Sequence, residues 1–245
     1  MNAPAQSAEQ RARWPRRVVA ELLDELPPDD PRAMRSRRDL RVVNRIMGHA
    51  SLLTRALDAV ATRSPLRLVE LGAGDGTLLL RLAQRRASRW PKAVVTVLDA
   101  QPTVAPATMA ALRAVGWTVE VIAADVFEWL EHPPADREAI VLANLFVHHF
   151  EGERLARLLR GIAAQAGAFV CCEPRRARLA LLGSHLLWAI GCNDVTRHDA
   201  VVSVHAGFRE RELTAAWQSA AGAGWQVAET PAGAFSHLFV ARRGT

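Results

Sequence analysis

Short apolar runs that alternate with helical segments fill the chain from residue 66 onward, and this alternation restricts the fold more than any other feature. Seven runs have the length of strands and cover residues 66–71, 94–99, 117–123, 139–143, 168–172, 225–229 and 236–241. Helical segments separate the first five runs, which predicts parallel strands whose crossover helices cover both faces of one sheet. Only a Pro-Ala-Gly turn separates the last two runs, so we expect them to pair antiparallel. The pattern predicts an α/β fold with a doubly wound, seven-stranded, mostly parallel sheet and an antiparallel last strand.

The first quarter of the chain carries helical patterns only. One pattern covers residues 15–26 and ends at two consecutive prolines. A second begins with Asp30 as N-cap and Pro31 at the first helical position, and continues to about residue 62. The polar, arginine-rich residues 1–13 are expected to be disordered.

These patterns divide the chain into two parts. Residues 1–64 are predicted to form an N-terminal tail and a helical cap, and residues 65–245 the sheet domain. Within that domain we expect a lid insertion at about residues 174–212. Its apolar run, residues 179–190, fits a helix that contacts an aromatic or lipidic substrate, and it fits an ordinary buried helix equally well.

Composition favours a soluble, cytoplasmic protein. No apolar segment follows the basic N-terminus, and the run at 179–190 is too short to span a bilayer. The three cysteines (Cys171, Cys172 and Cys192) form neither a disulfide framework nor a zinc motif, so we predict no metal site. The net charge of +6 comes almost entirely from arginines spread along the chain, which argues against a nucleic-acid substrate. The sequence leaves open whether the chain forms a homodimer.

A glycine-rich loop joins the first strand to the first helix of the sheet domain. Gly72, Gly74 and Gly76 allow a sharp turn and a close approach of a ligand to the backbone. A dinucleotide-binding loop would need a small residue for close helix packing where this chain has Thr77. Asp75 would also repel a pyrophosphate at the start of the helix. An ordinary structural turn remains the alternative.

With Glu70, the loop resembles the first motif of the class I S-adenosylmethionine-dependent methyltransferases, which has the form E-x-G-x-G-x-G. The resemblance implies a Rossmann-like fold, S-adenosylmethionine as the cofactor, and a loop that surrounds its methionine half with Glu70 toward the ammonium group. Asp99 ends the second strand, where an acid of this family accepts the ribose hydroxyls, although an aspartate there is often a turn former. Asp125 follows the third strand and is expected near the adenine amino group, as a helix N-cap, or both. The full set of expected cofactor contacts is Glu70, Gly72, Ala73, Gly74, Gly76, Asp99, Ala100, Asp125, Val126, Asn144 and Leu145.

The segment after the fourth strand, Asn144–Phe150, departs from the N/D-P-P-F/Y motif of DNA and glutamine N-methyltransferases. It is similar to small-molecule methyltransferases of the ubiquinone-biosynthesis type, and the arrangement also resembles methyltransferases of polyketide-type phenols. The expected reaction is therefore methylation of a hydroxyl oxygen on an aromatic or polyketide-type molecule. His149 is the first candidate for the general base, followed by His148 and His198, because imidazole titrates near neutral pH. C-methylation of a quinone-like precursor, N-methylation, and RNA binding or modification through the arginine-rich helix at 35–45 remain alternatives.

Overall fold

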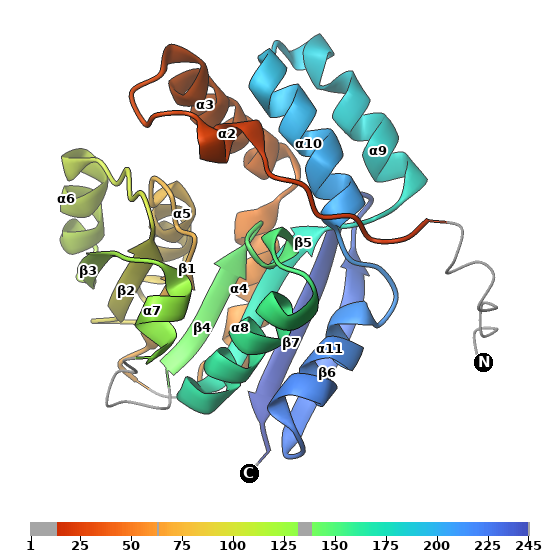
Figure 1. Cartoon of the computed structure of the whole chain (residues 1–245). Coiled ribbons are helices and arrows are strands. Elements are labelled where there is room, and N and C mark those ends of the chain that lie inside the picture. Colours follow the sequence, from red (N-terminus) through yellow and green to blue (C-terminus); the bar gives the residue numbers. More distant parts are fainter. Residues whose placement is uncertain (1–13, 63, 132–138, 245) are drawn as a thin grey trace.

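The computed structural model describes residues 14–62, 64–131 and 139–244; the tail expected at residues 1–13 lies outside them. Its centre is a seven-stranded sheet flanked by helices, with a cap of helices above the carboxyl edge of the parallel strands (Figure 1). The strands are β1 (Arg67–Leu71), β2 (Val94–Asp99), β3 (Thr118–Ala123), β4 (Ala139–Asn144), β5 (Ala166–Pro174), β6 (Trp225–Ala232) and β7 (Ser236–Arg243).

The strand order is β3-β2-β1-β4-β5-β7-β6. Strands β1 to β5 pair in parallel, and β7 is antiparallel to both of its neighbours. The predicted fold class is therefore confirmed, including the antiparallel last strand. Strand β5 is longer than predicted at both ends and includes Glu173, a residue that becomes important at the site.

Helices cover both faces of the sheet. One face carries α4 (His49–Val60), α5 (Thr77–Arg86) and α6 (Pro106–Ala114); the other carries α7 (Val126–Glu131), α8 (Gly152–Gln165) and α11 (Glu212–Ala221). Alternate residues of each parallel strand enter different cores. Val69 and Leu71 pack on the α7–α8–α11 side, whereas Leu68 packs on the α4–α5–α6 side. Two-sided burial of this kind explains why these strands read as continuous apolar runs.

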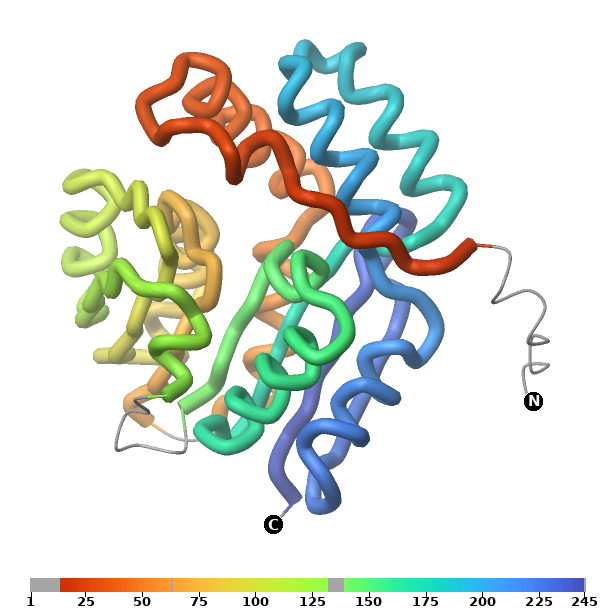
Figure 2. Tube along the Cα trace, in the orientation of Figure 1, coloured from red at the N-terminus to blue at the C-terminus, as the bar shows by residue number. Residues whose placement is uncertain are grey.

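The cap consists of α2 (Leu22–Glu25), α3 (Pro31–Ile46), α9 (Arg178–His185), the 3-10 helix η2 (Leu186–Ile190) and α10 (Asp194–Ala206). Helix α10 contacts both α2 and α3, so segments from opposite ends of the chain lie side by side. The extended N-terminal segment, residues 14–21, crosses α10 before it reaches α2 (Figure 2). None of the described helices is long and apolar enough to cross a membrane.

Two helix predictions were wrong. Residues 15–26 form only the single turn α2, because the backbone of this segment bonds to distant groups; Arg17 N–H donates to the carbonyl of His205. The helix predicted to extend from Asp30 to about residue 62 is two helices. It breaks at Gly48, whose φ of +69° is left-handed, although Asp30 does cap α3 as expected.

The apolar run at 179–190 also differs from both expectations. It forms α9 and then the tighter helix η2, and large side chains of this run point to solvent instead of a substrate or a core. Trp188 is 63% exposed and Leu182 is 54% exposed.

Candidate functional site

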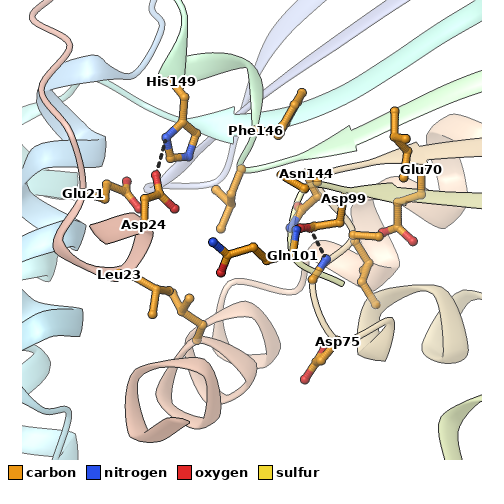
Figure 3. A pocket seen from close by; sticks show the side chains of 18 of the residues that line it. Glu21, Leu23, Asp24, Glu70, Asp75, Asp99, Gln101, Asn144, Phe146 and His149 are labelled. Atoms are coloured by element: carbon orange, nitrogen blue, oxygen red, sulfur yellow. Dashed lines mark hydrogen bonds and ion pairs between the residues drawn. The ribbon is translucent and has the colours of Figure 1, made fainter. Parts of the chain in front are cut away.

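A cavity of about 680 Å³ lies at the carboxyl ends of β1, β2, β3 and β4. Its walls come from the loops after these strands, from the N-terminal segment including α2, and from α3 (Figure 3). Ten of the eleven residues expected to contact a cofactor line it: Glu70, Gly72, Ala73, Gly74, Asp99, Ala100, Asp125, Val126, Asn144 and Leu145. Gly76 does not line the cavity; it sits at the N-cap of α5 with a φ of +69°.

The glycine loop is held in the shape that the cavity needs. Gly72 has a φ of +66°, and a β-carbon there would overlap the ring of Phe146. The amide of Gly74 donates to Asp99 Oδ2 over 2.8 Å, which ties the loop to the end of β2. Glycine at position 72 is therefore required both by the backbone conformation and by the close ring of Phe146.

Glu70 is a buried carboxyl group with an unused acceptor. Its side chain is at the cavity wall but only 2% exposed, and Oε2 has no hydrogen-bond partner in the described part of the chain. Burial, together with the charges of Asp75 and Asp99, raises the pKa of Glu70 to about 8. Three carboxyl groups thus gather around the loop. A cationic ligand is the natural complement of such a site.

Asp99 and Asp125 both hold backbone groups and still face the cavity. Asp99 Oδ1 accepts the amide of Gln101 over 2.8 Å, and Asp125 Oδ1 accepts the amide of Phe127 over 2.7 Å at the start of α7. The N-cap interpretation of Asp125 is therefore correct. Each carboxylate oxygen can accept more than one hydrogen bond, so capacity for a ligand remains in both.

His149 lies on the cavity wall opposite the glycine loop (Figure 3). Its Nδ1 is 3.5 Å from Oδ2 of Asp24, which projects from α2. Burial, followed by the positive charge of His148, lowers the pKa of His149 to about 4. The imidazole is therefore neutral at pH 7 and can accept a proton.

His148, in contrast, is 2% exposed and is not part of the cavity wall. Its Nδ1 lies 2.8 Å from Glu173 Oε2, and its Nε2 lies 3.3 Å from Glu21 Oε1. Burial opposes the charged form, but these two carboxylates outweigh it and raise the pKa of His148 to about 9. Glu173 also accepts the amides of Phe146, Val147 and His148 at the 3-10 helix η1 (Val147–His149). This geometry makes His148 a structural cation at pH 7.

His198 is remote from the cavity wall. Its side chain is 47% exposed and its Nδ1 lies 2.9 Å from Asp199. Asp199 is buried and accepts the amides of Leu22 and Leu23, so it caps α2 from the neighbouring helix α10. The expected lid insertion thus supports the N-terminal segment, while its residues do not appear in the cavity wall.

One group of side chains has the spacing of a metal site. The ligand atoms of Glu21, His148 and His149 all lie within 4.8 Å of one another. Both ring nitrogens of His148 already lie beside carboxylates. The protonated ring therefore neutralises the same negative charges that a metal ion would neutralise.

Sequence reasoning missed several residues of this site. Glu21 and Asp24 lie in the segment that was interpreted as a regular helix. Phe146 lies within the segment Asn144–Phe150 and Glu173 directly follows the predicted fifth strand, and neither residue was expected at the site. The Glu-Pro pair that ends β5 was the one sign that the strand continues beyond Cys172.

The glycine loop after β1, the acid at the end of β2 and the mixed sheet together define the class I methyltransferase architecture. Residues 68–165 match a family model described as a methyltransferase domain. This confirms the resemblance to class I S-adenosylmethionine-dependent methyltransferases. The matched range covers β1 to α8, about two fifths of the chain.

Solved structures agree with this assignment at the level of the fold. An O-methyltransferase family protein from Burkholderia thailandensis is 20% identical with a TM-score of 0.60, over 89% of this chain and 61% of that one. The mitomycin 7-O-methyltransferase MmcR is 21% identical with a TM-score of 0.59, over 91% and 60%. The plantazolicin methyltransferase BamL, solved with SAH, is 10% identical with a TM-score of 0.63, over 91% and 93%. The chain spans about three fifths of the first two proteins. A comparison with curated proteins gave no match.

Proposed function

We propose that this chain transfers a methyl group from S-adenosylmethionine to a hydroxyl oxygen of a small aromatic or polyketide-type molecule. The observation that carries the proposal is one continuous cavity with two chemically different ends. Glu70 and the glycine loop form one end, and His149 with Asp24 forms the other. A volume of about 680 Å³ is in the range of small-molecule sites. S-adenosylmethionine, when bound, supplies the activated methyl group on a sulfonium.

The residues at the first end fit that cofactor. Glu70 Oε2 and Asn144 Oδ1 are buried acceptors with no hydrogen-bond partner among the residues that the structure describes, and an ammonium group would satisfy them. Asp99 would accept the ribose hydroxyls, and Asp125 would accept the adenine amino group beside Val126. Gly72 and Gly74 would let the methionine half approach the backbone. These roles position the cofactor; they require no metal.

The residues at the other end fit proton removal from a hydroxyl group. His149 would accept the proton at a ring nitrogen while the oxygen attacks the methyl carbon, and Asp24 would stabilise the imidazolium that results. Phe146 and Phe150 provide an apolar wall. The N-terminal segment closes this end through Val18 and Leu23 and would exclude water from the reaction.

The RNA alternative loses support from the contacts of α3. Three arginines of the helix at 35–45 make internal contacts: Arg35 binds Asp39, Arg37 binds the carbonyl of Pro28, and Arg41 binds Asp75. Much of its positive charge is therefore committed within the chain. C-methylation and N-methylation would use the same cavity. The atom that carries the methyl group in the product distinguishes them from O-methylation.

Two variants and a substrate panel test the proposal. Methyl transfer to a series of phenols, with the product atom assigned by NMR, should yield methyl ethers. His149→Ala should lower kcat about 100-fold or more, because a general base contributes that much, while SAH binding stays unchanged. His148→Ala tests the structural role of the His148 cation, and this variant should have a lower melting temperature than the wild type. Full turnover in His149→Ala would refute the role of His149, and carbon-methylated products or salt-dependent RNA binding would favour the alternatives.

A further inference from the structure

A second cavity of about 420 Å³ adjoins the first. It lies where the end of α3, the first turn of α4 and the exposed side of α5 meet. Asn44, Ala50 and Arg81 line both cavities, so the two share a wall. The remaining lining residues are Arg45, Gly48, Ser51, Gln84 and Arg85, and no acidic residue is among them.

Three arginines give this cavity its positive charge. The side chains of Arg45, Arg81 and Arg85 form no salt bridge or hydrogen bond with the residues that the structure describes. Arg41, one turn before Arg45, instead forms an ion pair of 2.6 Å with Asp75. Burial and then the charge of Arg45 lower the pKa of Arg81. Asp75 opposes this shift, but the charges of Arg85 and Arg41 add to it, and the pKa is lowered overall. Three like charges at one cavity repel one another unless an anion joins them.

The first turn of α4 adds a second source of positive potential. Gly48 ends the preceding turn in a left-handed conformation, and no side chain of a described residue caps this 12-residue helix. Ser51 and Leu52 donate their amides to the carbonyl of Gly48. The amides of His49 and Ala50 form no hydrogen bond in the described part of the chain. Free amides and the helix dipole at this end favour an anion.

We propose that the second cavity binds a phosphate-type dianion, held by Arg45, Arg81, Arg85 and the first turn of α4. Guanidinium groups bind phosphate oxygens in a bidentate manner, and three of them with a helix N-terminus match a charge near −2 better than a single carboxylate would. The ion is either free or a phosphate group on the methyl acceptor that reaches past Arg81. The site goes beyond the proposed methyl transfer and does not depend on which atom is methylated.

Calorimetry on the full chain tests this site. Pyrophosphate and inorganic phosphate would be titrated in low-chloride buffer, with and without saturating SAH. The test variant is Arg45→Ala/Arg85→Ala, since neither residue lines the first cavity. The control is Arg113→Ala/Arg178→Ala, which removes the same charge from two other exposed positions.

Pyrophosphate should bind the wild type and the control alike, with SAH present or absent, and at least tenfold more weakly to the test variant. SAH affinity should be equal in all three proteins, which separates this result from a failure of the first site. No pyrophosphate binding, or equal binding to the test variant, would overturn the proposal. Competition between SAH and pyrophosphate, with weaker SAH binding to the test variant, would also overturn it, because the arginines would then hold the carboxylate of the cofactor.

A pair of acceptors identifies the source of the ion. If the phosphate belongs to the acceptor, 4-hydroxyphenyl phosphate should have a lower KM than hydroquinone, and Arg45→Ala/Arg85→Ala should remove the difference. Equal KM values together with pyrophosphate binding indicate a free ion at the same site.

Discussion

Cofactor binding should release a proton from Glu70. The pKa of this buried carboxyl is raised to about 8, so it is protonated at pH 7 before a ligand binds. The ammonium group of the ligand would stabilise the ionised form and lower that pKa. At pH 7 the protein should therefore lose about 0.9 proton for each SAH bound, and affinity should fall about tenfold between pH 7 and pH 6. Affinity falls as the pH is lowered because the free protein binds this proton more tightly than the complex does.

Calorimetry in buffers of different ionisation enthalpy measures this release directly. Glu70→Gln keeps the shape of the side chain without a titrating group, so both the release and the pH dependence should disappear. In wild type, 5′-methylthioadenosine should also bind without proton release, because it lacks the ammonium group. Binding of SAH to wild type with no proton release and a constant affinity from pH 6 to pH 7 would refute the role assigned to Glu70.

Three other predictions follow from individual contacts. Gly72→Ala should weaken SAH binding at least tenfold by calorimetry, because the new β-carbon would overlap Phe146, whereas Gly233→Ala at another left-handed glycine with open space should bind normally. Asp199→Ala should cost about 1–2 kcal/mol of unfolding free energy by urea denaturation, since it removes the cap of α2; an unchanged midpoint would contradict this. His148 has a folded pKa of about 9, above its ordinary 6.5, so its stabilisation is complete below pH 6.5 and is lost as the pH rises through 9. The melting temperature of wild type should therefore drop between pH 7 and 9.5 more than that of Glu21→Gln, and equal drops would count against the ion pair.

The parts that sequence predicted correctly are local in the chain. Each parallel strand and the helix after it are neighbours in sequence, and the glycine loop contains its own turn residues. Ten of the eleven expected contact residues consequently line one cavity. The failed predictions depend on remote contacts. The segment from Arg16 to Glu21 has helical periodicity, yet Arg16 donates to the carbonyls of His148, Phe150 and Ala206 and so holds the chain extended.

The same difference explains why His148 and His149, adjacent in sequence, have opposite chemistry. Both are imidazoles on one 3-10 turn, and nothing in the motif distinguishes them. Glu173 at the end of β5 and Glu21 in the N-terminal segment hold His148 as a cation. Burial lowers the pKa of His149, and the charge of His148 lowers it further. Which of the two imidazoles carries a charge thus depends on carboxylates that lie 128 and 24 positions from His149 in the chain. Because the N-terminal segment supplies Glu21, Asp24 and part of the cavity wall, we expect substitutions there to alter the pKa of His149 and the shape of this end of the cavity together. The loops that face the cofactor would be unaffected.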